Sequence, residues 1–545
     1  MSGTEDVQVG RGDHAAQGGK PKKWMSVADA LDLAREHLQA GRLVEAEKIS
    51  GEIASARSNN PDAHHLLGIA SFKLNRLERA IKAIERAIEL APQTAGFHAN
   101  LAEMYRLRGR PELGLAAGEK AVALDPVNAQ AWNNLGILHF DKGDFATSES
   151  CYRKAVAAQD SFAHAWNNLG NTLVRLNRDS EAHQAFARAI ALMPDYSEAM
   201  VNDGLCFREE GELGLAEERF QQALQVNPKN INGRVSLSIL RMLQGDYERG
   251  VPEYEWRLAL PEIRRANLPG ELWRGQSIAD KRIFVYGEQG LGDVLQYLRY
   301  LKPLQTRRPI SIVLQVQPGL QRLVEENFPF VEVVRNQPAA DSADFHCAIM
   351  SLPYLLGLPI LAAEAEEGYL EADEELVASF TKRFAAYPGL KVGLVWAGNT
   401  SHKYDHNRSM ASEYLLPLLK AQGCTFFSLQ IGSKAANADL LKAGMIDLSS
   451  DVSNMPSTAA AISALDLVIV VDTSLAHLAG ALGAPVWTLL SAVPDWRWGL
   501  TAGTTPLYSS MRLFRQPKPH DWATVIAQIS GALAEVKPID LAPTV

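Results

Sequence analysis

The hexapeptide AWNNLG occurs twice in this chain, at Ala131–Gly136 and at Ala165–Gly170, 34 residues apart. Prolines outside the two copies, and glycines inside and outside them, fall at multiples of the same interval. The prolines are Pro92, Pro126, Pro194 and Pro228, and the glycines are Gly68, Gly136, Gly170 and Gly204. Ala102 occupies the missing glycine position and Asp160 the missing proline position. A period of this length predicts an array of stacked structural repeats.

Each unit of the array is expected to form a helical hairpin. The glycine or alanine marks the place in the first helix where the second helix crosses closely, and small residues recur in the second helix at Ala87, Ala121, Ala155, Ala189 and Ala223. The proline ends the second helix because it cannot donate to the helical ladder. One hairpin cannot bury its apolar face alone, so hairpins stack into a superhelix with a concave face. The pattern resembles tetratricopeptide repeats, with good units over 62–228, a weaker one from about residue 26 and a degraded one to about residue 258.

An asparagine recurs two residues before the glycine or alanine position. The four are Asn100, Asn134, Asn168 and Asn202. One interpretation is that asparagine is merely tolerated on a solvated helix face. The other is a ladder of amides along the concave groove, since an amide can pair with any peptide backbone. The repeats of O-linked N-acetylglucosamine transferases carry such a ladder, and this resemblance implies that the four residues bind an extended protein acceptor.

Bulk composition sets wide limits. The 545 residues are 47% hydrophobic and 21% charged, typical of a folded protein of several domains, and the net charge of −9 does not favour nucleic-acid binding. The four cysteines have neither zinc-site nor disulfide spacing, which favours the cytoplasm. No stretch of 18 apolar residues predicts a membrane span. Residues 1–23 are polar and rich in glycine, and they are expected to be a disordered leader.

From about residue 280 the pattern changes to strand-like runs that alternate with helical ones, which predicts parallel βαβ units. A first block has strand-like runs at 282–287, 311–316, 331–336 and 345–350, with helices expected at 293–307 and 319–327. A second block has runs at 391–398, 424–430, 445–450, 465–472 and 484–491. The expected fold class is an α solenoid followed by two Rossmann-like halves. Ligands of such sheets lie beyond the carboxyl ends of the strands.

The first loop at a strand end is GEQGLGD, residues 287–293. Gly290 and Gly292 allow the backbone to approach a ligand closely, and the helix that follows offers free N–H groups to an anion. The spacing is not that of a dinucleotide-binding loop, which disfavours a dehydrogenase. Asp293 is interpreted either as a helix-capping residue or as a catalytic base.

Two further loops follow strands of the second block. The loop at 396–410 concentrates His402, Lys403, His406 and Arg408, and it is either a solvated charged loop or a diphosphate contact led by Arg408. Asn399 and Gln430, at the ends of neighbouring strands, are also assigned to the donor. The loop after 465–472 carries four more candidates. These are Asp472, Thr473, Ser474 and His477. Hydroxyl and N–H groups at a helix start suit a phosphate, whereas a lone histidine on an apolar helix is more often a core residue.

The loops together resemble GT-B glycosyltransferases, in particular the heptosyltransferase-like group. The shared motifs are Gly292-Asp293 and the segment from Asp472-Thr473 through His477 and Gly483 to Pro485. The resemblance spans roughly residues 280–530, and the tail around PDWRWGL is similar to bacterial repeat-plus-transferase proteins. It implies a sugar-nucleotide donor, transfer with inversion or retention, and Asp293 as the base. The chain has no D-x-D motif, so no metal and no cofactor are expected.

The predicted organisation is a leader at 1–23, a repeat array at 24–260, a first Rossmann-like half at 261–375 and a second half with the nucleotide-sugar site at 376–545. The predicted function is transfer of a sugar to a protein acceptor, for example flagellin or another surface protein, recruited by the repeats. Two alternatives stay open: a transferase acting on a lipid-linked saccharide, and a non-catalytic scaffold with a degenerate transferase domain.

Overall fold

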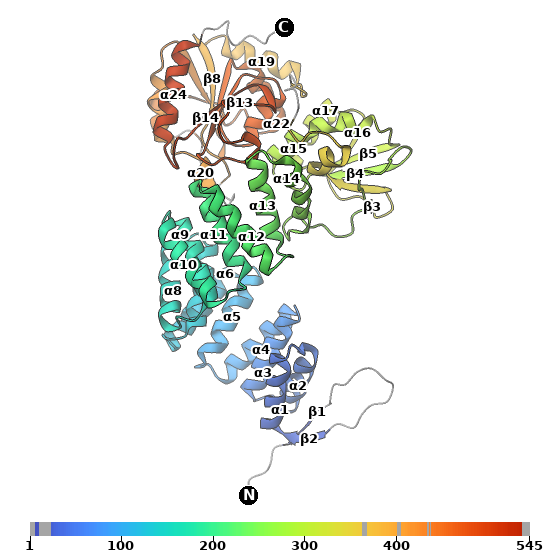
Figure 1. The fold of residues 1–545 in the computed structure, drawn as a ribbon, viewed down its shortest axis with the longest axis vertical. Coiled ribbons are helices and arrows are strands. Elements are labelled where there is room, and N and C mark those ends of the chain that lie inside the picture. The colour runs from blue at the N-terminus through green and yellow to red at the C-terminus, as the bar shows by residue number, and fades with distance from the viewer. Residues whose placement is uncertain are drawn as a thin grey trace. The chain divides into compact units, whose positions relative to one another are not determined.

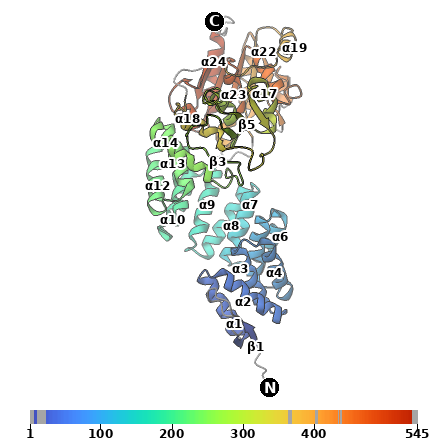
Figure 2. The ribbon, with the colours of Figure 1, turned by 90° about the vertical axis from the view of Figure 1, so that its right-hand side faces the viewer.

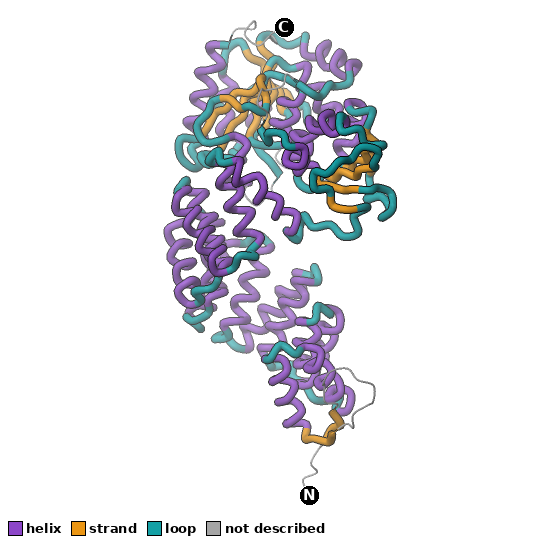
Figure 3. Tube along the Cα trace, turned by 45° about the vertical axis from the view of Figure 1, so that its right-hand side comes forward, coloured by secondary structure: helices purple, strands orange, loops and turns teal. Residues whose placement is uncertain are grey.

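The computed structural model describes residues 6–9, 23–361, 368–399, 405–432, 435 and 438–536. The chain divides into two compact units, Met1–Cys206 and Phe207–Val545. Figure 1 labels the helices and strands in chain order, and Figure 3 shows that the first unit is helical apart from one short pair of strands. Among the helices of the described residues, none has the length and apolarity to cross a lipid bilayer.

Seven helical hairpins lie between residues 27 and 254 of the part that the structure describes, and their first helices start 34 residues apart. They are α1 (Val27–Gln39) with α2 (Leu43–Ala56), α3 (Pro61–Lys73) with α4 (Leu77–Leu90), α5 (Ala95–Leu107) with α6 (Pro111–Leu124), α7 (Ala129–Asp141) with α8 (Phe145–Ala158), α9 (Ala163–Arg175) with α10 (Asp179–Leu192), α11 (Ser197–Glu210) with α12 (Leu213–Val226), and α13 (Ile231–Leu243) with α14 (Tyr247–Tyr254). The period read from the sequence is confirmed.

The glycine positions are explained by the residue that lies 16 positions later. A methyl group on Gly68 would lie 2.5 Å from Ile84 Cδ1, and one on Gly170 would lie 2.5 Å from Phe186 Cε1. Where the first helix has Ala102 instead, the second helix has a glycine at that distance, Gly118. The two helices of a hairpin can therefore approach closely because a glycine lies where they cross, and this glycine can belong to either helix.

The N-terminal end of the array is covered by a short antiparallel pair of strands, β1 (Asp6–Val9) and β2 (Lys23–Ser26). The sequence predicts a disordered leader here, but the structure places a strand at 6–9. Val7 is 2% exposed and packs against apolar residues of the first hairpins, among them Leu31 and Ile53. This contact supplies the apolar burial that the polar composition of the leader does not suggest. Residues 1–5 and 10–22 lie outside the described residues.

The first α/β half contains a five-stranded parallel sheet in the order β3-β7-β4-β5-β6. Its strands are β3 (Glu271–Leu272), β4 (Arg282–Tyr286), β5 (Ser311–Gln315), β6 (Val331–Val334) and β7 (Phe345–Ala348). The four longer strands were all predicted. The single helix expected at 293–307 is instead α15 (Leu291–Tyr297), a 3-10 turn and α16 (Leu301–Gln305). Pro303 supplies no N–H to the helical ladder, which is consistent with this interruption.

The second half contains a seven-stranded sheet in the order β10-β9-β8-β11-β12-β14-β13, parallel except for β13. Its strands are β8 (Leu390–Val395), β9 (Cys424–Ser428), β10 (Ile446–Asp447), β11 (Leu467–Val471), β12 (Val486–Leu490), β13 (Thr504–Thr505) and β14 (Tyr508–Arg515). Numbered by their order in the chain, the parallel strands run 3-2-1-4-5-6, the order of doubly wound nucleotide-binding sheets. The first sheet shows the same 3-2-1-4 order in β6-β5-β4-β7.

Helices cover both faces of the larger sheet, which explains why its strands are continuous apolar runs. Leu467, Ile469 and Val471 pack toward α24 (Trp522–Glu535). Val468 and Val470 point to the opposite face, which α19 (Glu374–Phe384), α22 (Met455–Ala464) and α23 (Ser474–Ala481) cover. Figure 2 shows α24 on one side of the sheet and α19 and α22 on the other. Side chains alternate between the two faces because successive residues of a strand point in opposite directions.

The last repeat hairpin belongs to the α/β core. Met242 of α13 and Tyr254 of α14 lie in the same apolar cluster as Val294 of α15 and Val470 of β11. A 3-10 turn, η1 (Glu255–Ala259), connects this hairpin to the first sheet. The core of the second unit is thus shared by a repeat hairpin and both sheets.

We expect Gly170→Ala to destabilise the first unit, because its methyl group would clash with the fully buried ring of Phe186. Overpacking of this kind costs about 1–3 kcal/mol. Gly96 of α5 has no atom within 4 Å of an added methyl group. The control Gly96→Ala should therefore be neutral or slightly stabilising. Chemical denaturation of both variants checks this expectation, and equal midpoints would contradict the packing explanation.

Candidate functional site

The order of the larger sheet reverses between β8 and β11, and ligands of doubly wound sheets bind at this point. The two strands pair in parallel, so their carboxyl ends lie at one edge. β8 leads into Trp396, Ala397 and Gly398, and β11 leads into Asp472 and Thr473. Two of the loops that the sequence analysis selected therefore meet beside each other at the place where the topology favours a ligand.

Helix α23 begins directly after this edge, with Thr473 as its N-cap residue in an extended conformation. The Thr473 hydroxyl makes no side-chain capping bond, and its Oγ1 atom is buried without a hydrogen-bond partner among the described residues. A buried hydroxyl without a partner costs free energy unless a ligand or water satisfies it. This hydroxyl and the first N–H groups of α23 form an arrangement that suits an anion.

His477 lies one turn into α23 and is 6% exposed. Its Nδ1 is 3.0 Å from the Tyr508 hydroxyl, and its ring stacks on Trp498 with the centroids 5.1 Å apart. Burial, and to a lesser extent Arg497 and Arg299, lower the pKa of His477 well below its usual value. A neutral imidazole can donate one hydrogen bond to a phosphate, but it adds no positive charge to the site.

Asp472 is partly buried at the end of β11. Burial, reinforced by the carboxylate of Asp495, raises the pKa of Asp472 to about 6, although the positive charge of Arg408 opposes this shift. A carboxyl group with this pKa exchanges protons near neutral pH. Besides Asp293, which the sequence analysis selected as a candidate base, Asp472 is thus an acid that can take part in proton transfer.

The loop after β8 is held by a side chain from the end of β9 and by side chains of its own. Gln430 accepts hydrogen bonds from the N–H groups of Trp396 and Ala397 through Oε1, at 3.1 and 3.0 Å. Arg408, in α20 (Asp405–Arg408), donates to Asp405 over 3.4 Å. Gln430 therefore shapes the loop through its carbonyl oxygen. Asn399 is exposed at the end of the described part of this loop, and His402 and Lys403 lie outside the described residues.

The glycine-rich loop of the first half contacts α23. A methyl group on Gly292 would lie 2.8 Å from His477 Cδ2 and 3.2 Å from Ser474 Cα. The absence of a side chain at Gly292 thus lets α15 pack against the start of α23. Gly290 is exposed and is the N-cap residue of α15. Of the two predicted glycines, Gly292 lies at the contact between the two halves and Gly290 caps the helix that makes it.

Asp293 has both carboxylate oxygens occupied. Oδ2 accepts the Gly290 N–H at 2.9 Å, which caps α15 as one of the two interpretations expects, and Oδ1 contacts the Arg497 guanidinium. Arg497 also donates to Gln296 at 2.6 Å and to Asp495 at 2.8 Å. The role of Asp293 as a base stays a prediction, and it would require the contact with Arg497 to open.

Sequence reasoning missed Arg497, Asp495 and Trp498 as members of this site. They follow β12 in the stretch PDWRWGL, and Arg497 is 6% exposed. An arginine between two tryptophans in the loop that follows a strand is a signal that could have selected them. The pairing of Arg497 with Asp293 of α15 could not be identified this way, because the two residues are about two hundred positions apart in the chain.

The four repeat asparagines form a hydrogen-bonded ladder inside the first unit, and each amide nitrogen bonds to the residue 35 positions earlier. Asn100 Nδ2 lies 2.8 Å from His65 Nε2, and Asn134 Nδ2 donates to the Ala99 carbonyl at 2.9 Å. Asn168 and Asn202 donate to the side-chain oxygens of Asn133 and Asn167, at 3.0 and 2.9 Å. The ladder therefore joins neighbouring repeats. Each amide nitrogen carries a second hydrogen, so acceptor binding stays a prediction.

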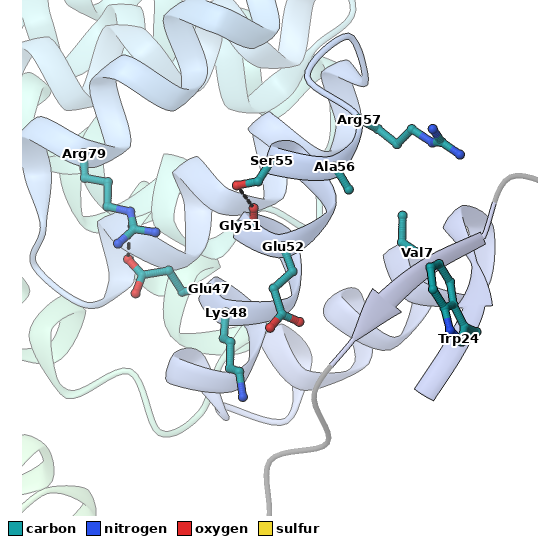
Figure 4. A pocket seen from close by; sticks show the side chains of 10 residues that line it. All are labelled: Val7, Trp24, Glu47, Lys48, Gly51, Glu52, Ser55, Ala56, Arg57 and Arg79. Carbon is teal, nitrogen blue, oxygen red and sulfur yellow. Dashed lines mark hydrogen bonds and ion pairs between the residues drawn. The ribbon is translucent and has the colours of Figure 1, made fainter. Parts of the chain in front are cut away.

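A separate hollow lies on the first unit between β1, β2 and α2 (Figure 4). It is lined by Val7, Trp24, Glu47, Lys48, Gly51, Glu52, Ser55, Ala56, Arg57 and Arg79. Glu47 is 4% exposed and is already bonded to Ser71 and paired with Arg76 and Arg79. The lining mixes both signs of charge and contains none of the residues predicted for the donor or the acceptor.

Comparisons with known proteins agree with the repeat architecture. One tetratricopeptide repeat model matches residues 127–195, and another matches 31–95, 65–129 and 167–231. Protein FlbA of Caulobacter vibrioides is 28% identical over 326 residues, which are 53% of this chain and 53% of FlbA. This chain thus spans about half the length of the curated relative that it matches. The N-terminal hairpins are tetratricopeptide repeats.

Solved structures resemble parts of the chain at low overall similarity. The Cut9–Hcn1 hetero-tetramer of APC/C gives a TM-score of 0.37 and 19% identity over 39% of this chain and 42% of that chain. Pseudomonas aeruginosa PilF gives a TM-score of 0.33 and 20% identity over 37% of this chain and 91% of that chain. At these values the likenesses carry no argument about function.

We expect Asn168→Asp to destabilise the first unit, because a carboxylate keeps the shape of the amide but cannot donate to Asn133. Asn133 is 4% exposed, and an unsatisfied buried acceptor costs about 1–3 kcal/mol. The control Gln184→Glu makes the same amide-to-acid change on an exposed face of α10 and should have little effect. Chemical denaturation compares the two variants. Equal midpoints would favour the interpretation that the asparagines are only tolerated.

We expect Asp472→Asn to stabilise the protein at neutral pH. A raised carboxyl pKa means that the folded state favours the protonated form, so the resulting stability is present below about pH 4 and is lost as the pH rises through about 6. About two pKa units correspond to at most about 3 kcal/mol. The advantage of the variant should be larger at pH 7.5 than at pH 5. Denaturation midpoints at both pH values, with the exposed Asp341→Asn as control, test this, and a pH-independent difference would contradict it.

Proposed function

We propose that the second unit is a GT-B type glycosyltransferase that uses a nucleotide-sugar donor. The observation that carries this proposal is the topology. Two parallel sheets each reverse their strand order, and α15 of one half packs against the start of α23 of the other half. Two such halves with facing strand ends provide one place for a nucleotide and another for an acceptor.

The donor diphosphate would lie at the start of α23. The N–H groups of Ser474 and its neighbours, the unpartnered Thr473 hydroxyl and the guanidinium of Arg408 would hold its charge. His477, being neutral, would contribute at most one hydrogen bond and the packing of this helix. Stabilising the leaving diphosphate is the main electrostatic requirement of sugar transfer.

The acceptor hydroxyl needs a base, and two carboxylates are available. Asp293 would serve once its contact with Arg497 opens. Asp472 is the second candidate because its pKa, raised to about 6 by burial, suits proton exchange near neutral pH. The acceptor would be a protein, such as flagellin or another surface protein, held by the repeats. A lipid-linked saccharide is the alternative acceptor, and the reaction would take place in the cytoplasm.

We expect Thr473→Val to weaken the binding of a nucleoside diphosphate about tenfold, because one hydrogen bond to a charged phosphate is lost. The variant should be as stable as the wild type or more stable, since the hydroxyl has no partner in the protein. The measurement is binding of UDP, GDP, CDP and ADP by calorimetry, together with denaturation.

Thr488 provides a matched control. Its hydroxyl on β12 is also buried without a partner among the described residues, but it lies inside the sheet. Thr488→Val should therefore leave nucleotide affinity unchanged. Equal affinity in wild type and Thr473→Val would remove Thr473 from the site. The scaffold alternative is favoured if the wild type binds none of the four nucleotides and also does not cleave nucleotide sugars to free nucleoside diphosphate.

A further inference from the structure

The glycine-rich loop is anchored to the repeat array by a buried arginine. The Arg257 side chain, from the turn that follows the last repeat hairpin, has no exposed surface, and neither does the side chain of Glu288 in the loop. Arg257 donates to Glu288 Oε1 from Nη2 at 2.9 Å and to the Ser351 hydroxyl at 2.8 Å. It also pairs with Glu255. One guanidinium thus connects the repeat hairpin, the glycine-rich loop and the end of β7.

A tyrosine of the same hairpin holds the next residue of the loop. The Tyr254 ring lies under the Arg257 guanidinium, 4.8 Å from its centre. The Tyr254 hydroxyl accepts a hydrogen bond from Gln289 Nε2 at 3.1 Å. Burial raises the pKa of Tyr254 to about 12, so this hydroxyl is neutral. Glu288 and Gln289 are the two residues between Gly287 and Gly290, and the hairpin holds both.

The position of this loop determines one wall of the candidate donor site. The loop leads directly into α15, where Gly292 lies against Ser474 and His477. Because interiors are closely packed, a shift of the loop would change this contact. Arg257 and Tyr254 hold the side chains of the loop at one end, and Arg497 bonds to Asp293 at the other. The backbone carbonyl groups of Gly287 and Gln289 also accept hydrogen bonds, from Arg265 and Gln317 of the first half.

The loops after β8 and β12 also contact repeat-helix residues of the second unit. Asn407, next to Arg408, donates a hydrogen bond to Glu209 at the end of α11. Trp496 packs edge-on against Tyr247 of α14, with the ring centroids 6.5 Å apart. The glycine-rich loop and the loops after β8 and β12 are therefore each in contact with a repeat-helix residue of the second unit.

We propose that Arg257 and Tyr254 are positioning residues that hold the glycine-rich loop in its donor-binding conformation, so that the last repeat hairpin sets the affinity of the transferase for its nucleotide. This proposal rests on the proposed function for its nucleotide readout. A lysine at position 257 would keep the charge, but a single ammonium group cannot replace the forked guanidinium that bonds to Glu288, Glu255 and Ser351 at once. The buried Glu288 carboxylate would lose part of its compensation, and the loop would move to hydrate or protonate it. Without the Tyr254 hydroxyl, Gln289 loses one hydrogen-bond acceptor and the loop gains freedom.

The test uses the full chain with the variants Tyr254→Phe and Arg257→Lys. Glu253→Gln is the matched control, because Glu253 lies in the same helix α14 but pairs with Arg234, away from the loop. The first readout is the dissociation constant for UDP, GDP, CDP and ADP. We expect it to rise about threefold in Tyr254→Phe and tenfold or more in Arg257→Lys, with no change in the control. Tyr254→Phe should unfold at nearly the wild-type temperature.

The second readout is hydrogen–deuterium exchange of residues 287–293 without nucleotide. Exchange should increase in Tyr254→Phe and in Arg257→Lys relative to wild type and control. If exchange in both variants equals that of the wild type, the positioning role is overturned, whatever the nucleotide result. If exchange increases but wild type and variants bind nucleotide equally, the loop does not control affinity and the proposal also fails. If the wild type binds none of the four nucleotides, the proposed function fails, and with it the claim about affinity, while exchange still decides whether the hairpin holds the loop.

Discussion

The close approach of α15 and α23 at Gly292 is the contact on which the arrangement of the second unit depends. Any side chain at position 292 would meet His477 and Ser474 at or below van der Waals distance. Because there is none, α15 packs against the start of α23, and the glycine-rich loop that precedes α15 becomes one wall of the candidate site after β11. Arg497 can then connect the two halves by bonding to Asp293 and Gln296.

Two buried arginines make charged contacts with the segments around this contact. Arg257 and Arg497 are each surrounded by two carboxylates, Glu255 and Glu288 for the first, Asp293 and Asp495 for the second. Removing such charges from water costs several kcal/mol per ion, and pairing returns this cost only when the geometry is good. Buried pairs therefore add little net stability, but they penalise every arrangement in which a partner is missing. Their effect is to favour one loop conformation over others.

The sequence predicts the repeats and most strands because both leave periodic signals. Gly68, Gly136 and Gly170 fall at multiples of 34 residues and indicate where two helices cross, and the long apolar runs indicate strands that are buried on both faces. β14 was not predicted because its stretch, Tyr508–Arg515, mixes serines and arginines with apolar residues. The site was predicted only in part. Loops at strand ends are local features, whereas the partners of Asp293 and Glu288 come from distant segments.

The asparagine ladder shows how a residue can be selected correctly from sequence and still have more than one role. A recurrent amide on the inner helices suits peptide binding, but the same geometry places it beside the preceding repeat, where its nitrogen donates a hydrogen bond. These bonds restrict the angle at which one repeat stacks on the next. A change in the pitch of the array would strain the bond at every repeat that has one. The second amide hydrogen then faces a direction that the first bond has already fixed. An extended acceptor would thus meet donors at a spacing set by repeat stacking, so the pitch of the array limits which backbone conformations it can accept.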